Sequence, residues 1–218
     1  MGSDGAVTGL SGITGLTDRL PYYAIITDDP MRTRMLSAHW LENTKVLYEL
    51  RGMIGYTGMY KGAAIALLSA GYGETSALLY LHDACLLGAR RVIYTGECVS
   101  QTPEVHLRDV IIAKGGDEKL TGCALRASKQ FSIPTSVREA YTNDRMFLGD
   151  PSFSGDIVDY ASYAVAGYAS KLEVAAISVL TVSQNTATGE RVEEHERQSR
   201  FNTAAQLAFE TIAIDADC

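Results

Sequence analysis

The chain has 218 residues, of which 46% are hydrophobic and 21% are charged. A chain of this length and apolar content can bury a sizeable core and is too apolar to be intrinsically disordered. Its 26 acidic and 19 basic residues give a formal net charge of −7. This balance argues against nucleic acid or an anionic membrane surface as a partner, because both attract basic patches.

The sequence contains no run of the roughly 18 apolar residues that a membrane-spanning helix needs. Its first 21 residues lack the basic and apolar regions of a secretory signal. The four cysteines include no CxxC pair, and the four histidines are scattered along the chain. We therefore expect a cytoplasmic protein with reduced thiols, no disulfide framework, no bound metal and no cofactor.

Residues 1–20 are rich in Gly, Ser and Thr, and we expect a flexible segment with one short helical turn near 16–20. A buried strand is predicted over 22–27, followed by a helix over 30–40 that Asp29 caps and Pro30 begins. The later segments alternate: strands over 45–50 and 53–60, an apolar run over 63–70, a helix over 74–87, strands over 91–95 and 109–113, a helix over 120–130, a segment over 136–141, a helix across 156–170, a strand over 174–182 and a helix over 195–212.

This alternation predicts an α/β domain over residues 21–218 with a largely buried sheet. In such sheets, ligands bind where strands end and loops or helices begin. The strand ends nominate Asp28 and the segments 71–74, 96–98, 141–144 and 183–185.

The segment RGMIGYTGMYKG (51–62) closely resembles the RGMxGxTGxYKG motif of bacterial purine nucleoside phosphorylases, in the purine nucleoside and uridine phosphorylase family. Other stretches follow in the family's order over about residues 23–212. DDPMR (28–32) resembles GDPxR, GYGETS (71–76) resembles GMGxPS, TGECVS (95–100) resembles VGSCG, HLRDVIIA (106–113) resembles KLRDVVI, and HERQSRFN (195–202) resembles AERQTTFN. IVDYAS (157–162) and TVSQN (181–185) stand where the family has VEMEAA and TVSDH.

The resemblance implies a single α/β domain with a central mixed β-sheet flanked by helices. It also implies a homo-oligomer, either a dimer or a ring of three dimers. In the family, one subunit lends the Arg of RGM, here Arg51, to the phosphate site of its neighbour. The family's reaction is phosphorolysis of a nucleoside to a free base and ribose 1-phosphate.

The sequence departs from the family at the phosphate-binding positions. Asp28 replaces a glycine whose N–H faces phosphate, Tyr94 replaces a phosphate-binding arginine, and Glu97 replaces a serine. Of the basic residues, Arg32 and Arg51 remain. Because carboxylates repel a phosphate dianion, we expect that the phosphate site is lost.

The sugar and base positions are altered as well. Ala161 replaces the glutamate that binds the ribose hydroxyls, and Gln184 replaces the aspartate that protonates the leaving base. An amide cannot act as that acid. We predict Glu97 and Asp28 as catalytic residues, and the predicted substrate-binding residues are Arg32, Arg51, Tyr72, Tyr94, Met146, Asp159, Tyr160, Ser183, Gln184 and Arg197.

Acidic and phenolic replacements favour a pocket respecified for acid–base chemistry without phosphate, such as cyclisation, elimination, isomerisation or hydrolysis in specialised biosynthesis. The ligand would be a small molecule, either nucleoside-like or amine-bearing. Two alternatives stay open: a non-catalytic binding or partner subunit, and a nucleoside-cleaving enzyme with displaced catalytic groups. In addition, Glu97 could simply pair with Arg32 or Arg51 in an emptied site, and Cys98 is expected to be a buried apolar side chain rather than a nucleophile.

Overall fold

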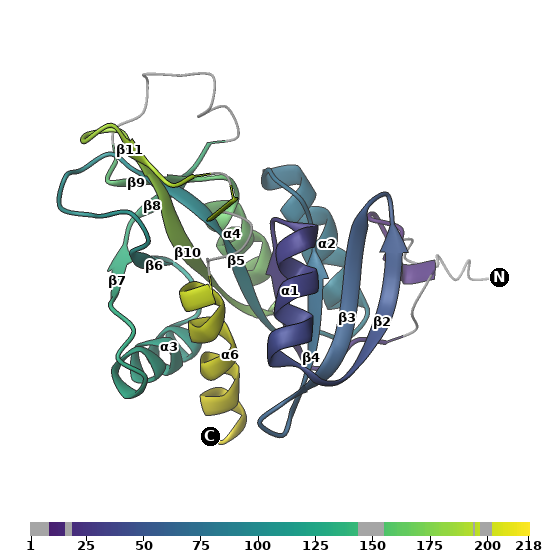
Figure 1. Cartoon of the computed structure of the whole chain (residues 1–218). Helices are drawn as coiled ribbons and strands as arrows, with labels where there is room; N and C mark the ends of the chain where they lie inside the picture. The colour runs from purple at the N-terminus through teal and green to yellow at the C-terminus, as the bar shows by residue number, and fades with distance from the viewer. Residues whose placement is uncertain (1–8, 16–18, 144–154, 194, 197–201) are drawn as a thin grey trace.

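A mixed β-sheet forms the centre of the computed structural model, which describes residues 9–15, 19–143, 155–193, 195–196 and 202–218 (Figure 1). Its strands lie in the order β2-β3-β4-β1-β5-β10-β6-β7. In chain order these are β1 (Tyr23–Thr27), β2 (Glu42–Leu50), β3 (Met53–Tyr60), β4 (Ala63–Ser69), β5 (Arg91–Ser100), β6 (Val110–Ala113), β7 (Thr135–Arg138) and β10 (Ala175–Asn185). Three short strands extend the sheet at β5 and β10: β8 (Ala140–Thr142), β9 (Ile157–Asp159) and β11 (Glu190–Arg191).

The central strands β4, β1, β5 and β10 are parallel to one another, whereas β2 and β3 extend the sheet as antiparallel strands. Helices cover both faces of this sheet (Figure 1). α2 (Glu74–Leu86) and α4 (Ser162–Lys171) pack on one face, and α1 (Pro30–Trp40), α3 (Glu118–Gln130) and α6 (Asn202–Ala216) pack on the other. The structure is thus a single α/β domain, as the sequence predicted.

The prediction for α1 and β3 is confirmed to the residue. The Asp29 carboxylate accepts hydrogen bonds from the backbone N–H groups of Met31 at 2.7 Å and Arg32 at 3.2 Å, and Pro30 begins the helix. A carboxylate cap followed by proline is a strong local signal for a helix start. It also sets where Arg32 lies, in the first turn after β1.

β5 is longer than the sequence predicted. The strand was expected to end at Thr95, but it continues to Ser100. Two neighbours pair with the extension: β10 as far as Asn185 opposite Ser100, and β9 through Asp159 opposite Cys98. Glu97 and Cys98 are therefore strand residues with fixed backbone.

The predicted helix across 156–170 is wrong in its first part, because Ile157–Asp159 forms β9 and the helix begins at Ser162. The segment 136–141 lies in two short strands, β7 and β8. The predicted helix over 195–212 corresponds in part to α6, which runs from Asn202 to Ala216; residues 197–201 lie outside the described part.

The described residues of the segment that was expected to be flexible are anchored to α2. The Asp83 carboxylate accepts hydrogen bonds from the backbone N–H groups of Leu10 at 2.7 Å and Ser11 at 2.8 Å. Ile13 is fully buried and begins a short 3₁₀ turn, Ile13–Gly15. The helical turn expected near 16–20 falls largely on residues outside the description.

Two tight turns bound β3. Arg51 and Gly52 have φ values of 53° and 80°, and Lys61 and Gly62 have φ values of 46° and 85°. A pair of residues with positive φ is the signature of the hairpin turn that matches strand twist. Part of the RGMIGYTGMYKG motif is therefore explained by the fold itself, because glycine adopts this conformation without strain.

Candidate functional site

Three charged side chains meet at the carboxyl ends of β1 and β5. Asp28 follows β1, Arg32 lies in the first turn of α1, and Glu97 lies in β5. β1 and β5 are parallel neighbours with Thr27 opposite Thr95, so the residues that follow lie side by side. The rule that ligands bind at the carboxyl ends of parallel strands nominated this place from the sequence.

Arg32 bridges the two acids. Its Nη1 lies 2.6 Å from Asp28 Oδ1, and its Nη2 lies 3.0 Å from Glu97 Oε1. The backbone N–H of Glu97 also donates to Asp28 Oδ2 at 3.1 Å. All three side chains are buried, with relative exposures of 1% for Asp28, 2% for Glu97 and 4% for Arg32. We call these three residues the carboxylate–arginine cluster.

The cluster contains one positive and two negative groups when fully ionised. Burial and the neighbouring Glu97 raise the pKa of Asp28, Arg32 opposes the shift, and the resulting pKa is about 6. Since this pKa is higher in the folded protein than in the unfolded chain, Asp28 contributes most to stability below pH ~4, and that contribution is lost as the pH rises to ~6. Asp28 can therefore hold or release a proton near neutral pH.

Tyr94, a residue of β5, lies next to the cluster inside the sheet. A Cβ built on Gly96 would lie 3.0 Å from both Asp28 Oδ2 and the Tyr94 hydroxyl, so both groups converge on this glycine. Burial and the negative charges of Asp28 and Asp159 raise the pKa of the Tyr94 phenol well above its usual range. Tyr94 is thus a neutral phenol at the position where the sequence resemblance implies an arginine.

Two further tyrosines lie on the outer side of the cluster. The Tyr72 hydroxyl donates to Glu97 Oε1 at 3.3 Å, and the rings of Tyr72 and Tyr160 meet edge to face at 5.3 Å between centroids. Tyr72 is 49% exposed, so it connects the buried carboxylate to the surface. The structure therefore brings together six of the predicted site residues: Asp28, Arg32, Glu97, Tyr94, Tyr72 and Tyr160.

Asp159 has contacts that differ from those expected of a sugar-binding residue. Its carboxylate is fully buried and accepts hydrogen bonds from the N–H groups of Ala161 at 3.2 Å and Ser162 at 2.7 Å. It therefore satisfies two backbone N–H groups at the beginning of α4. Burial raises its pKa to about 6, although the hydrogen bonds from Ser162 lower it.

The remaining predicted residues lie apart from the cluster or outside the description. Ser183 is buried and donates from its hydroxyl to the carbonyl of Cys98 at 3.3 Å, while Gln184 is exposed beside a bulge in β10. Arg51 is exposed on the β2–β3 turn. Met146 and Arg197 lie outside the described residues.

Cys98 is fully buried, and burial raises the pKa of its thiol well above the ordinary value. This supports the expectation of an apolar side chain, because a reactive cysteine needs an accessible thiolate. Gly96 lies in the segment 96–98 that the strand ends nominated, although it was not among the predicted catalytic or substrate-binding residues. Its role is to leave room, because the Asp28 carboxylate and the Tyr94 hydroxyl both approach its Cα.

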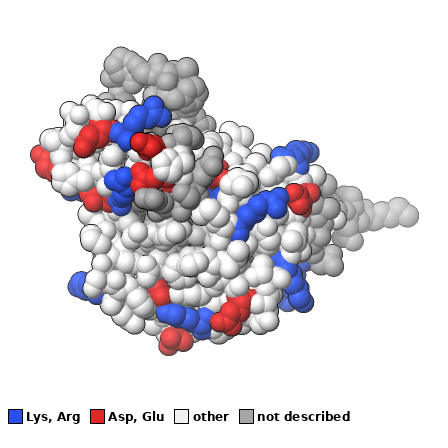
Figure 2. Space-filling view, viewed as in Figure 1, with Lys and Arg blue, Asp and Glu red and all other residues white. Residues whose placement is uncertain are grey.

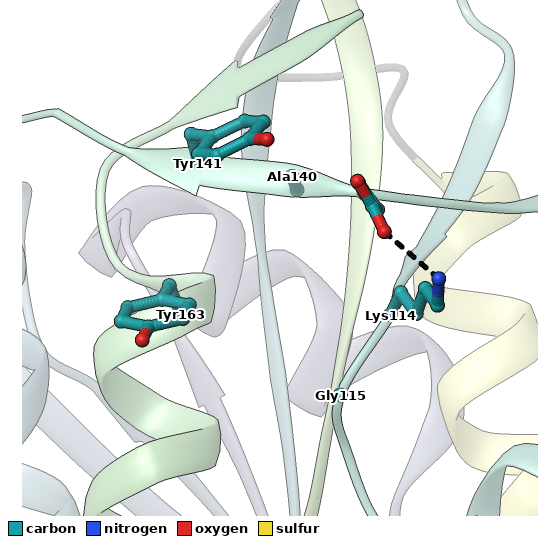
Figure 3. Close-up of a pocket in the computed structure, with 6 residues that line it drawn as sticks. Lys114, Gly115, Ala140, Tyr141 and Tyr163 are labelled. Atoms are coloured by element: carbon teal, nitrogen blue, oxygen red, sulfur yellow. Dashed lines mark hydrogen bonds and ion pairs between the residues drawn. The ribbon is translucent and has the colours of Figure 1, made fainter. Parts of the chain in front are cut away.

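A separate pocket of about 260 Å³ lies beside β8 and the first turn of α4 (Figure 3). Tyr141 and Tyr163 line it on one side, and Lys114 lines it on the other with its Nζ 2.8 Å from Glu139 Oε1. Tyr163 is 75% exposed. None of these residues belongs to the carboxylate–arginine cluster.

Among the described residues, no cluster of three or more His, Cys, Asp or Glu side chains is arranged to hold a metal ion. The same part of the chain contains no helix with the length and hydropathy needed to cross a membrane. Figure 2 shows basic and acidic side chains interspersed on the face in view rather than gathered into one basic stripe.

A family model described as "Phosphorylase superfamily" matches residues 22–143, which is more than half of the chain. The chain belongs to this superfamily. The matched range includes the whole carboxylate–arginine cluster.

Among curated proteins, this superfamily member is 26% identical over 215 residues to "Purine nucleoside phosphorylase DeoD-type 2" of Aliivibrio fischeri, covering 86% of this chain and 91% of that protein. It is 29% identical over 216 residues to "Purine nucleoside phosphorylase DeoD-type" of Limosilactobacillus reuteri, with the same coverage. A solved structure of purine nucleoside phosphorylase from Toxoplasma gondii in complex with immucillin-H aligns with a TM-score of 0.78 at 18% identity, covering 90% of this chain and 91% of that one. At that identity, the structural likeness concerns the fold.

Replacing Arg32 by methionine should destabilise the protein by about 3–5 kcal/mol at pH 8, because it leaves two buried carboxylates without their cation. The decrease in the free energy of unfolding should be smaller at pH 5, because Asp28 takes up a proton there and one of the two negative charges disappears. Urea unfolding of the variant and the unsubstituted protein at both pH values measures this.

Arg34→Met is the matched control, because Arg34 lies on the same helix and pairs with Glu49 at the surface at 2.7 Å. An exposed pair of this kind should contribute less than about 1 kcal/mol. Equal losses for the two variants, or a loss for Arg32→Met that does not depend on pH, would contradict the assigned role of Arg32.

Proposed function

We propose that this superfamily member is an enzyme that uses the carboxylate–arginine cluster for acid–base chemistry on a nucleoside-like or amine-bearing small molecule, without inorganic phosphate. The observation that carries the proposal is the pairing of Arg32 with both Asp28 and Glu97. The class of reaction would be cyclisation, elimination, isomerisation or hydrolysis.

The pairing of Arg32 with two carboxylates supports a reaction that does not use inorganic phosphate. A guanidinium binds an anion such as phosphate through Nη1 and Nη2 together. In Arg32, both of these nitrogens already contact carboxylates of this chain. A phosphate dianion brought to this place would meet the charges of Asp28 and Glu97 at short range. Repulsion of that kind amounts to several kcal/mol in a partly buried site.

The protonation of the cluster supports the acid–base chemistry. Asp28 has a pKa of about 6, so near neutral pH it exists in both forms and can exchange a proton through its neighbours. Glu97 contacts the half-exposed Tyr72 and is therefore the acid nearer to an incoming ligand. A carboxylate beside the phenols of Tyr72 and Tyr160 suits a ligand with a cationic or amine group.

A second candidate function is a binding or partner subunit without catalysis. The very low exposure of Asp28 and Glu97 favours it, because a closed ion cluster can serve stability alone. Turnover distinguishes the two candidates, since a binding subunit would retain its ligand unchanged.

Phosphorolysis of inosine, adenosine and uridine should be absent or very slow. The arginine, glutamate and aspartate that the resemblance assigns to this reaction are replaced by Tyr94, Ala161 and Gln184. Each such loss commonly costs on the order of 10²-fold or more in rate. Release of free base should be measured with and without inorganic phosphate, and phosphate-dependent release at the rate of a purine nucleoside phosphorylase would overturn this part of the proposal.

Glu97→Gln should lower turnover by roughly 10² to 10⁴-fold, because an amide cannot exchange the proton. Substrates are first sought by incubating the unsubstituted protein with panels of nucleosides and of amines and following product masses. Cys98→Ser is the control, since Cys98 is the buried neighbour in the same strand. Full turnover by Glu97→Gln, with Cys98→Ser equally active, would exclude the carboxylate mechanism.

We also propose that the chain forms a homo-oligomer. Arg51 is exposed and has a φ of 53°. This backbone conformation favours glycine or asparagine. An arginine at such a position suggests that its side chain has a use, which we propose is a contact between subunits. Light scattering at micromolar concentration should give at least a dimer, and Arg51→Gly should weaken assembly while it leaves the turn intact. A monomeric unsubstituted protein would refute the proposal.

A further inference from the structure

Two cysteines lie close together at the end of the sheet opposite to the carboxylate–arginine cluster. Cys123 is buried on α3, and Cys218 is exposed just after α6, the helix that packs beside α3 (Figure 1). Arg126 Nη2 lies 3.1 Å from Cys123 Sγ and 3.2 Å from Cys218 Sγ. The two sulfurs are therefore separated by no more than the sum of these distances.

We propose that Cys123 and Cys218 form a redox-active dithiol that reacts with hydrogen peroxide and closes to a disulfide. The guanidinium of Arg126 contacts both sulfurs and so holds the two cysteine side chains at one place. Arg126 is itself exposed, so a small oxidant can reach this place.

Asp215 is a second charged group beside the thiols, and its Oδ1 accepts a hydrogen bond from the Cys123 thiol at 3.9 Å. Its negative charge is matched by two cations, Lys119 Nζ at 3.0 Å and Arg91 Nε at 3.3 Å. The positive group that remains directed at the sulfurs is Arg126.

Because Cys218 is exposed and Cys123 is buried, we expect Cys218 to react with the oxidant first. The exposed Cys218 thiolate attacks one oxygen of hydrogen peroxide, the O–O bond breaks, hydroxide leaves, and the sulfur is oxidised to a sulfenic acid. The Cys123 thiolate then attacks that sulfur, the S–S bond forms, and the second hydroxide leaves and takes up a proton. Two thiols and one peroxide give one disulfide and two molecules of water.

The other two cysteines serve as internal controls. Burial raises the pKa of the Cys85 thiol to about 11 and that of the Cys98 thiol well above its ordinary value, although Arg90 lowers the former. Both thiols are thus protonated at neutral pH and should react slowly. Selectivity for Cys123 and Cys218 is therefore expected within the same molecule.

The test is oxidation of the full chain with a small excess of hydrogen peroxide at pH 7.5, followed by tryptic peptide mapping without reductant. A link between peptides 120–126 and 201–218, with the loss of two hydrogens and reversal by a thiol reductant, is the expected result. The oxidised protein should also unfold about 5–10 °C higher than the reduced protein, because the bond closes a long loop.

Arg126→Ala should slow the formation of the link by roughly three- to tenfold, because the two sulfurs lose the positively charged group that contacts both of them. Lys129→Ala, an exposed residue on the same helix, is the matched control and should leave the rate unchanged. The proposal is overturned if Cys218 is oxidised to sulfinic acid without linking to Cys123, if the link joins two chains, or if Arg126→Ala reacts as fast as the control.

Discussion

One buried guanidinium holding two buried carboxylates is the constraint on which the proposed chemistry depends. Arg32 gains an ion pair with Asp28 and another with Glu97, and the three side chains are almost completely removed from water. Because the positive charge is outnumbered, the cluster binds a proton more readily than isolated carboxylates would. The protonation of Asp28, the stability of the fold and any reaction at Glu97 are therefore coupled through a single arginine.

The sheet determines the geometry of that cluster. The parallel register of β1 and β5 places the residues after Thr27 beside those after Thr95, and the cap at Asp29 starts α1 so that Arg32 can reach both acids. Gly96 leaves room for the Tyr94 hydroxyl and the Asp28 carboxylate at the same point. A larger side chain there would have to displace one of these groups.

The two proposals lie at opposite ends of the strands and can fail separately. The carboxylate–arginine cluster lies at the carboxyl ends of β1 and β5, whereas Arg91, which pairs with Asp215 near the thiols, begins β5. Oxidation of Cys123 and Cys218 should therefore change stability with little effect on the carboxylates. Loss of turnover in Glu97→Gln would likewise leave peroxide reactivity intact.

The sequence by itself determined the α/β class, the family resemblance and the elements with local signals. α1 was predictable from Asp29 and Pro30, and β3 from the turns at Arg51-Gly52 and Lys61-Gly62, because these signals act within a few residues. It also singled out Asp28, Tyr94 and Glu97 as residues at which the chain departs from the motifs it resembles. It could not tell which of several acids and arginines would pair.

Only the tertiary structure decided those pairings. β5 extends past Thr95 because β9 and β10 supply hydrogen-bond partners from far along the chain. The same pairing makes Ile157–Asp159 a strand and places the Asp159 carboxylate on the N–H groups of Ala161 and Ser162 at the beginning of α4. Arg32 meets Glu97 across 65 residues, and a contact of that separation depends on sheet register, which no local pattern encodes.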